Sequence, residues 1–379
     1  MDFNNFDNFN NDDYDFYDYN KKNRKKRKKK KNKKNHIKLM VILFFSTIVT
    51  LSICIFLLYS YNDERNKTLT VVNEIKVLEE EKEALFTQEE VDVLSEKEKN
   101  LLLEEVKKLV EDGSGMLDVL QYMYPDYVIA PSSGKYYFYP ISDQLKKNNF
   151  NLDNFTYPVE NEVTGNYEGE ANYQIDENTK AKRGIDVSTF QGEIDWKKVK
   201  NDGIEFSFIR LGYRGYESGK IVLDSRYEEN IKGSISAGID TGVYFFTEAL
   251  TEKEAIEEAD FIIENLSGYH ITMPVVIDVE ESANTEKTRT KDLTQDQRTK
   301  NVIAFCKRIK EAGYDVMIYG NIKSFMMMMD LEKLEEYDKW FAYYRYPFHY
   351  PYKIKMWQYT SSEKIDGIEG NVDVNLMFY

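Results

Sequence analysis

Short apolar runs alternate with helical patterns from residue 183 onward. Eight of these runs have the length and composition of β-strands: 184–188, 206–212, 242–246, 273–280, 316–320, 340–344, 354–360 and 372–378. Helical patterns separate the first five runs, and short loops join the last three. Because alternation of strands and helices implies parallel strands, we predict an α/β fold over residues 183–379, a TIM-like (β/α)5(β)3 barrel.

One continuous apolar segment precedes the barrel. Leu39–Tyr59 has 21 residues and no charge, which is long enough to cross a bilayer as a helix. A signal peptide would have a shorter apolar core followed by small residues, whereas this segment ends in Phe, Leu and Tyr. We therefore expect residues 39–61 to form an uncleaved transmembrane helix.

The distribution of charge orients this expected helix. The formal net charge is −15, yet residues 21–38 carry thirteen Lys or Arg and no acid, and residues 1–20 carry six Asp and no base. Basic flanks stay in the cytoplasm, so we expect residues 1–38 to be a disordered cytoplasmic tail and the barrel to lie outside the cell. At this position the basic run would meet anionic lipid headgroups, and we predict no nucleic-acid partner.

Polar segments connect the apolar segment to the barrel. Residues 62–112 are rich in Glu, Lys and Leu and predict a helical stalk, with a second helix that starts near Thr87 and stops at Gly113. The stalk could also self-associate as a coiled coil, although Lys82 interrupts its first apolar stripe. We expect residues 113–157 to form a small accessory region and residues 158–182 a linker.

Cysteine and histidine offer little chemistry in this chain. Cys54 and Cys306 lie in separate segments, so no disulfide framework is expected. His270 and His349 have no further ligands at metal-binding spacing and belong to no nucleophile motif. The sequence therefore implies neither a metal ion nor a cofactor.

Carboxylates at the ends of predicted strands are the candidate catalytic groups. Asp278 and Glu280 close an apolar strand and point to one face of it, because residues i and i+2 of a strand do so. Asp186 and Asp373 lie in the first and last predicted strands, although these two could instead cap loops or pair with Arg210. Clustered acids raise one another's pKa, which is what glycoside hydrolysis requires of its general acid.

Aromatic residues gather at the same strand ends. Their apolar faces and polar edges suit sugar rings. We predict that the substrate is bound by Arg210 together with these side chains: Tyr244, Phe246, Tyr319, Tyr343, Trp357 and Gln358.

Several motifs place residues 183–379 close to a known family. They are Gly184–Ser188 with Gln191-Gly192, Phe208–Gly212, Gly242–Tyr244, Pro274–Glu280, Tyr319–Asn321, Trp357–Tyr359 and Val372–Asn375. In this order and spacing they resemble glycoside hydrolase family 25, the Chalaropsis-type lysozymes. The sequence departs from the family at two positions. Many members have His where this chain has Phe245, and His or Tyr where it has Phe190.

The resemblance implies an N-acetylmuramidase, which cleaves the β-1,4 bond between N-acetylmuramic acid and N-acetylglucosamine in peptidoglycan. It implies that Glu280 is the acid, Asp278 its partner, and Asp186 and Asp373 the flanking carboxylates. Direct displacement, inversion through water and a substrate-assisted route all stay open, and we favour the last.

Together these features predict a membrane-anchored peptidoglycan hydrolase that remodels the cell wall locally. Its expected partners are glycan strands, the membrane and, through the stalk, a second copy or an envelope-spanning assembly. The alternative is a non-catalytic module that binds peptidoglycan and recruits such an assembly.

Overall fold

The computed structural model describes residues 88–160, 167–282 and 286–378, and the chain divides after Ser114 into two compact units. Within these three ranges no helix is both long and apolar enough to cross a membrane. The expected tail at residues 1–38 and the expected span at residues 39–61 lie outside the described residues, as does the first half of the expected stalk, residues 62–87.

The first unit contributes one described helix, α3 (Gln88–Glu111). Gly113 ends it as expected, because its backbone adopts φ of +84°, a left-handed conformation that glycine accepts easily. The Gly113 and Ser114 amides donate to the carbonyls of Val110 and Leu109, which satisfies two carbonyls of the last turn.

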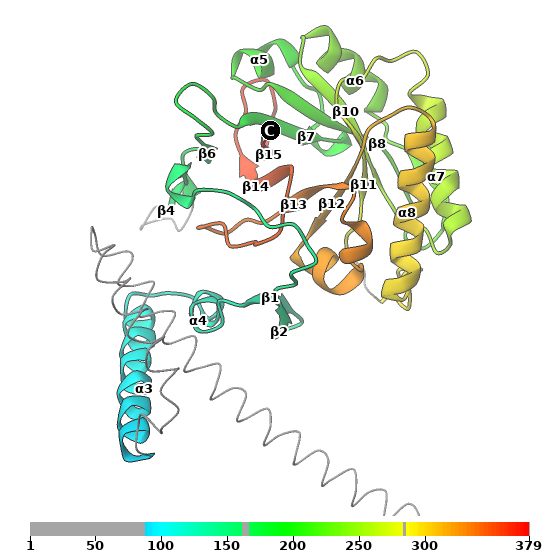
Figure 1. Ribbon diagram of the computed structural model, residues 1–379. Coiled ribbons are helices and arrows are strands. Elements are labelled where there is room, and N and C mark those ends of the chain that lie inside the picture. Colours follow the sequence, from blue (N-terminus) through cyan, green and yellow to red (C-terminus); the bar gives the residue numbers. More distant parts are fainter. Residues whose placement is uncertain (1–87, 161–166, 283–285, 379) are drawn as a thin grey trace, which may run out of the picture. The chain divides into compact units, whose positions relative to one another are not determined.

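Eight strands of the second unit close into a barrel, which confirms the predicted count (Figure 1). The barrel closes because β8 hydrogen-bonds to both β7 and β10. In chain order the strands are β7 (Lys182–Val187), β8 (Phe206–Arg214), β10 (Asp240–Phe246), β11 (Val275–Asp278), β12 (Val316–Asn321), β13 (Asp338–Ala342), β14 (Met356–Glu363) and β15 (Val372–Met377). A short strand, β9 (Ile221–Leu223), extends the sheet beside β8.

Helices follow the first four barrel strands. They are α5 (Trp196–Asn201), α6 (Tyr227–Ser236), α7 (Glu252–Asn265) and α8 (Gln295–Glu311). Thr251 and Thr294 cap α7 and α8 by accepting a hydrogen bond from the amide three residues on. The two helices lie side by side on the outside of the barrel (Figure 1). After β12 the chain forms only short turns of π-helix (Ser324–Met328) and 3-10 helix (Glu332–Leu334).

The last strand corrects the expectation of parallel strands throughout. β15 runs antiparallel to both β14 and β7. Its first residues therefore lie beside the last residues of β7, and Asp373 stands opposite Asp186. The reversal is what places Asp373 at the rim where the parallel strands end.

Residues 115–160 and 167–182 pack against the barrel, whereas a linker was expected over residues 158–182. Their elements are α4 (Met116–Met123), β1 (Tyr127–Ser132), β2 (Lys135–Pro140), a 3-10 turn (Leu152–Asn154), β3 (Phe155–Thr156), β4 (Val159–Glu160), β5 (Tyr167–Glu168) and β6 (Asn172–Tyr173). Ala171, Tyr173 and Ala181 are buried in the same core as the barrel residues. The polar residues of this stretch belong to its turns, so its composition does not indicate that Ala171, Tyr173 and Ala181 are buried.

Aromatic side chains join this segment to the strands that have no covering helix. Phe150 packs 4.4 Å from Phe378, and Phe155 packs 5.8 Å from Trp357, measured between ring centroids. Asn148 adds three hydrogen bonds to the β13–β14 connection, through its amide and side chain. The described part of this segment, residues 115–160 and 167–182, thus covers the β13–β15 side, as helices cover the other strands.

Candidate active site

Asp186 and Asp373 face each other across two neighbouring strands, at the rim where β7 ends and β15 begins. Asp186 is buried and accepts two hydrogen bonds on its Oδ2, from Gln358 Nε2 and Asn375 Nδ2, each 2.8 Å long. Burial and the nearby Asp373 raise the pKa of Asp186 well above its ordinary value, and the two donors oppose this rise because they favour the charged form.

The two amides are themselves oriented by other side chains. Tyr319 and Tyr344 donate their hydroxyls to Gln358 Oε1, over 2.8 and 2.5 Å. Trp340 Nε1 donates to Asn375 Oδ1 over 2.7 Å. With each amide oxygen committed to a donor, each amide NH2 group is left facing Asp186. Two chains of hydrogen bonds thus hold Asp186. One runs from Tyr319 and Tyr344 through Gln358, and the other runs from Trp340 through Asn375.

Asp278 and Glu280 come from the end of β11. Val276 lies in the apolar interior of the barrel, and Asp278, two residues later, points the same way. Glu280 is half-buried and accepts a hydrogen bond from Asn321 Nδ2 at 3.2 Å. Asn321 Oδ1 accepts from the amides of Lys323 and Ser324, so the turn after β12 fixes this side chain.

Burial raises the pKa of all four carboxyl groups above its ordinary value. For Asp186 the neighbouring Asp373 adds to the effect of burial, and for Asp278 the neighbouring Glu280 does so. The pKa of Asp373 rises to about 6. Four carboxyls in one low-dielectric site cannot all ionise at neutral pH, so the site retains a proton that it can donate.

Arg210 supplies the positive charge next to this cluster. Its Nε and Nη2 both lie 2.7 Å from Asp224 Oδ2, so Asp224 is the acid that it pairs with. Attraction to Arg210 lowers the pKa of Asp278, in opposition to burial. The alternative that Asp186 pairs with Arg210 is therefore wrong. Substrate binding by Arg210 stays a prediction.

Three of the predicted aromatic residues lie on the site's side of the barrel. Tyr244 is half-buried, and its pKa is raised by burial and then by Asp186. Phe246 is half-buried two residues later on the same strand. Tyr319 is buried and donates to Gln358. Gln358 is only 2% exposed, so it serves to position Asp186 and presents little surface to a substrate.

Trp357 and Tyr343 correct the prediction, because both pack outside the barrel. Trp357 is fully buried, donates from Nε1 to the Tyr343 carbonyl over 2.7 Å, and packs against Phe155. Tyr343 is 8% exposed and stacks on Phe341. Neighbouring strand residues point to opposite faces, so Trp357 could not share the site with Gln358.

Sequence reasoning missed five residues of the site: Asp224, Asn321, Trp340, Tyr344 and Asn375. Asn375 was detectable, because it lies two residues after Asp373 and shares its face. Tyr344 could be predicted only if Tyr343 was known to point out of the barrel, because its neighbour Tyr344 then points inward. Asn321 lies in the motif Tyr319–Asn321 but was not assigned to the site, and the roles of Asp224 and Trp340 depend on long-range contacts that no local pattern reports.

We expect Asp373→Asn to stabilise the fold at about pH 7.5 and to have no effect near pH 4. Since burial raises the pKa of Asp373 from 3.8 to about 6, ionising it costs folding free energy that develops between those values and persists above them. Removing this cost should gain on the order of 1–3 kcal/mol. Thermal unfolding at both pH values measures it, with the exposed Asp366→Asn as control. An equal gain at both pH values would contradict the prediction.

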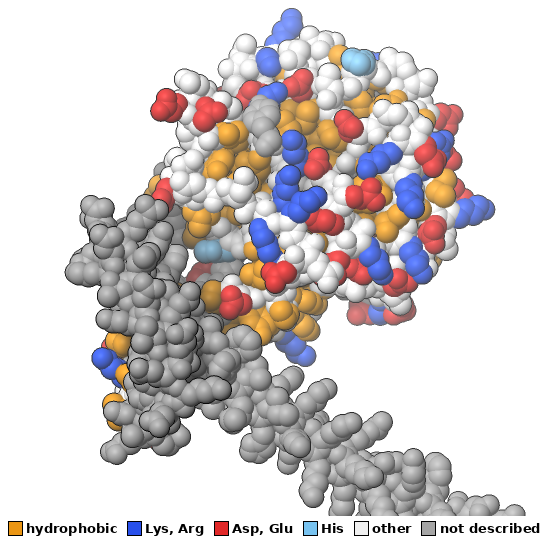
Figure 2. All heavy atoms as spheres, in the orientation of Figure 1, with side chains coloured by type: hydrophobic (Ala, Val, Ile, Leu, Met, Phe, Trp, Pro, Cys, Tyr) orange, Lys and Arg blue, Asp and Glu red, His pale blue; other side chains and the backbone are white. Residues whose placement is uncertain are grey.

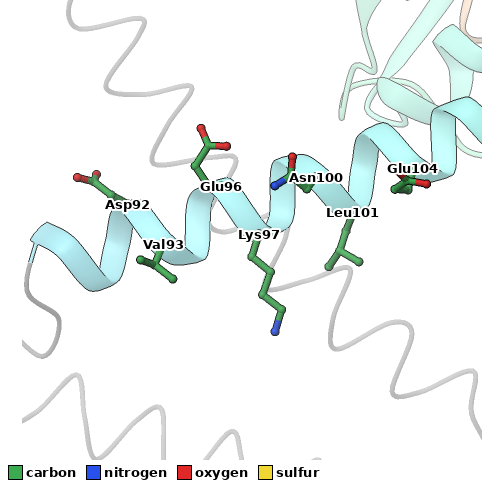
Figure 3. Close-up of a pocket in the computed structure, with 7 residues that line it drawn as sticks. All are labelled: Asp92, Val93, Glu96, Lys97, Asn100, Leu101 and Glu104. Carbon is green, nitrogen blue, oxygen red and sulfur yellow. The ribbon is translucent and has the colours of Figure 1, made fainter.

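Two further surface features bear on function. A hollow of about 770 Å³ lies against α3, and its described lining is one helix face: Asp92, Val93, Glu96, Lys97, Asn100, Leu101 and Glu104 (Figure 3). These side chains are all exposed and hold no carboxyl buried as in the barrel.

On the barrel unit, basic and acidic side chains are interspersed over α7 and α8 on the face that Figure 2 shows. Among the described residues this face offers no continuous basic track for a phosphate backbone.

The barrel matches a family of known proteins. Residues 185–368 match the family model for glycosyl hydrolases family 25. Lysozyme M1 of Streptomyces globisporus is 27% identical over 208 residues, which cover 52% of this chain and 68% of that protein. The autolytic lysozyme of Clostridium acetobutylicum is 25% identical over 194 residues, 51% of this chain and 55% of that protein. The match thus spans little more than half of the clostridial enzyme.

Two proteins to which this chain is similar have solved structures. A bacterial lysozyme from Streptomyces coelicolor is 26% identical, with a TM-score of 0.45, and the alignment covers 53% of this chain and 94% of that one. The modular autolysin LytC from Streptococcus pneumoniae, solved with a synthetic peptidoglycan ligand, is 26% identical with a TM-score of 0.49; the alignment covers 67% of this chain and 61% of that one. The family match and the lysozyme relatives agree with the barrel and its carboxyl cluster: the barrel of this chain is a glycoside hydrolase domain of family 25.

Proposed function

We propose that this protein is an N-acetylmuramidase, which hydrolyses the β-1,4 bond between N-acetylmuramic acid and N-acetylglucosamine in peptidoglycan. The observation that carries the proposal is the convergence of four carboxyls, from β7, β15 and the end of β11, at one rim of the barrel with raised pKa values. The match of the barrel to family 25 and the lysozyme relatives support the same substrate.

Glu280 is the proton donor in this proposal. It is the less buried acid of the β11 pair, so it can reach a bound glycan, and burial raises its pKa, so it retains a proton. The Asn321 side-chain amide donates to Glu280 over 3.2 Å and orients its carboxyl group. This hydrogen bond lowers the pKa of Glu280 by less than burial raises it. Glu280 protonates the glycosidic oxygen as the bond to C1 breaks.

Asp278 orients the substrate in this proposal. Its Oδ1 is buried and has no hydrogen-bond partner among the described residues, which leaves an acceptor that needs a donor. The N–H of the muramic-acid acetamido group would supply one. The acetamido carbonyl oxygen then attacks C1 as the leaving group takes the Glu280 proton. Water next attacks C1, returns a proton to Glu280 and restores the acetamido group, with retention at C1.

Product analysis tests this function. Peptidoglycan digested with the full-length protein and reduced with borohydride should yield fragments that end in reduced muramic acid, identified by mass spectrometry. Ends at reduced glucosamine, or intact glycan with the protein bound to the wall, would contradict the proposal; the second result would favour the binding module. An inverted anomer in freshly formed product, observed by NMR, would rule out the substrate-assisted route.

We expect Asn375→Leu to lower kcat by about a hundredfold and leave KM nearly unchanged, because it removes one donor from Asp186. Loss of that donor also raises the pKa of Asp186 further, so the acidic limb of the pH–rate profile should move to higher pH. Asn371→Leu, in the β14–β15 loop, is the control, since Asn371 is exposed and its side chain accepts a hydrogen bond from Lys364 far from Asp186 in the chain. A uniform loss at every pH would indicate a purely structural role for Asn375.

We further propose that residues 39–61 anchor the enzyme in the membrane, with its barrel toward the wall, so that it remodels the wall locally. The uncharged Leu39–Tyr59 segment and the basic run before it support this orientation. A tether raises the local enzyme concentration and restricts its range. The protein should sediment with membranes in high salt, and protease added to intact protoplasts should remove the barrel; release into the medium would contradict the anchor. Crosslinking through the stalk would reveal self-association or an assembly partner.

A further inference from the structure

The loop after β7 presents an apolar ring at the catalytic rim. Phe190 lies four residues after Asp186, and it is 81% exposed, the largest exposed fraction among the large apolar side chains that the structure describes. It also borders a hollow of about 1110 Å³, which leaves room for a ligand beside the ring. Single exposed apolar residues are common on protein surfaces, so the meaning of this one depends on how it is held.

Hydrogen bonds fix the turn that carries Phe190. The Phe190 amide donates to Ser188 Oγ over 3.2 Å, and the Ser188 amide donates to Gln191 Oε1 over 2.9 Å. The Thr189 amide donates to Asp224 Oδ2 over 3.1 Å. Because Asp224 is buried, this last bond ties the turn to the body of the barrel unit.

Arg210 supports the ring from one side. Its guanidinium carbon lies 4.9 Å from the Phe190 ring centroid and 5.5 Å from the Tyr213 ring centroid. Arg210 pairs with Asp224 Oδ2, the same atom that accepts from the turn. One buried carboxylate thus fixes both the backbone that carries the ring and the cation against its face. The ring is therefore oriented before a ligand arrives, which lowers the entropic cost of binding.

The pair of Phe190 and Arg210 lies next to the catalytic carboxyls. Asp186 on β7 stands opposite Phe208 on β8, and Arg210 follows two residues later on the same face of β8. Burial raises the pKa of Asp278, and attraction to Arg210 opposes the rise, so the guanidinium is also close to that carboxyl. A glycan bound at the carboxyls would therefore reach Phe190.

The order of the strands indicates which sugar reaches it. Around the barrel the strands follow the order β7, β8, β10, β11 and β12. Glu280, which protonates the breaking bond in the proposed function, follows β11 and accepts from Asn321 at the end of β12. The leaving sugar therefore lies toward β12. Phe190 and Arg210 lie on the opposite side of Asp278, at the ends of β7 and β8, where the sugar that precedes the muramic acid lies.

We propose that Phe190 is the platform on which the N-acetylglucosamine that precedes the muramic acid stacks. The inference rests on the proposed function, which places muramic acid at the catalytic carboxyls. The apolar C–H face of the sugar lies on the open side of the ring, opposite Arg210. Phe190 thereby makes the enzyme select a glycan with a sugar on the non-reducing side of the muramic acid.

Binding of sugars without turnover tests this assignment. The full-length protein is titrated with N-acetylmuramic acid and with N-acetylglucosaminyl-N-acetylmuramic acid, by ligand-observed NMR. The wild type should bind the disaccharide more tightly. Phe190→Ala should weaken disaccharide binding by about fivefold and leave the monosaccharide unchanged, because it removes one stacking contact. Phe190→Leu should lose as much, since it is apolar but has no flat face, whereas Phe190→Tyr should bind like the wild type.

Kinetics and a control variant complete the test. On peptidoglycan, Phe190→Ala should raise KM by about fivefold with kcat nearly unchanged, because the contact is shared by the substrate and the transition state. Ile256→Ala is the control, since Ile256 is a 38% exposed apolar side chain on α7, outside the barrel (Figure 1). It should change neither KM nor the affinity for either sugar.

Three results would overturn the inference: equal affinity of the wild type for both sugars, undiminished binding of the disaccharide by Phe190→Ala, or full retention of it by Phe190→Leu. Cleavage is scored separately. A wild type that binds the disaccharide through Phe190 but cuts no glycan would refute the proposed function and support the platform. A wild type that cuts glycan, with a Phe190→Ala variant that binds and cuts like it, would refute the platform alone.

Discussion

Glu280→Gln should lower kcat on peptidoglycan by roughly 10² to 10⁴-fold, the range expected for removal of a general acid. Gln keeps the size of the side chain and can still contact Asn321, so the fold should be preserved. It has no proton to give to the leaving oxygen. Release of reducing ends from purified peptidoglycan measures the loss, and circular dichroism checks the fold.

The neighbouring acid provides the control for this variant. Glu281 pairs with Lys323 at 2.6 Å on the surface, and its side chain is 46% exposed. Glu281→Gln should therefore change kcat by no more than about twofold, because an exposed ion pair contributes little. Comparable losses in both variants, or residual activity of Glu280→Gln near that of the wild type, would remove Glu280 from the role of proton donor.

A chain that begins at Arg183 should fail to fold, although residues 183–379 include every barrel strand apart from the first residue of β7. Removing residues 115–182 exposes Phe348, Trp357 and Phe378, which Phe150 and Phe155 cover. Loss of one such buried ring costs about 3–5 kcal/mol. Two or more of these losses approach the total stability of a domain, about 5–15 kcal/mol. A chain that begins at Gly115 retains the whole compact unit and should fold.

Soluble yield and thermal unfolding of the two chains test this prediction. A milder test is Phe155→Ala in the longer chain, which should lower the midpoint of unfolding markedly because Phe155 is 9% exposed. Phe138→Ala is the control, since Phe138 on β2 is 39% exposed and should matter little. If the Arg183 chain unfolds at the same temperature as the Gly115 chain, residues 115–182 are dispensable for the fold.

The carboxyl cluster was predictable because it depends on local rules. Parallel strands end at one rim, and residues i and i+2 share a face, so Asp186, Asp278 and Glu280 could be brought together from spacing alone. Asp373 was also assigned to the site, although its strand runs in the opposite direction. An antiparallel strand begins at the rim where the parallel strands end. Asp373, near the start of β15, therefore lies at the predicted rim although its strand is not parallel.

The facing of aromatic residues was less predictable. Trp357 and Gln358 were both assigned to the substrate, yet adjacent residues of a strand point to opposite sides. The structure resolves the conflict through Phe155, which covers Trp357 from outside the barrel. This contact joins residues some 200 positions apart in the sequence, and no local pattern contains it.

The N-terminal cover also has a consequence for how the protein is made. Phe150 and Phe155 leave the ribosome well before Phe348, Trp357 and Phe378, the rings they pack on in the finished fold. Until β15 has been synthesised, the barrel cannot close and the early aromatic residues have no surface to bury. The nascent chain therefore carries exposed rings through most of translation, a condition that favours aggregation. Because of this order of synthesis, we expect the unit to fold late and as a whole. Until then, avoiding aggregation requires that the exposed aromatic rings be shielded from other chains.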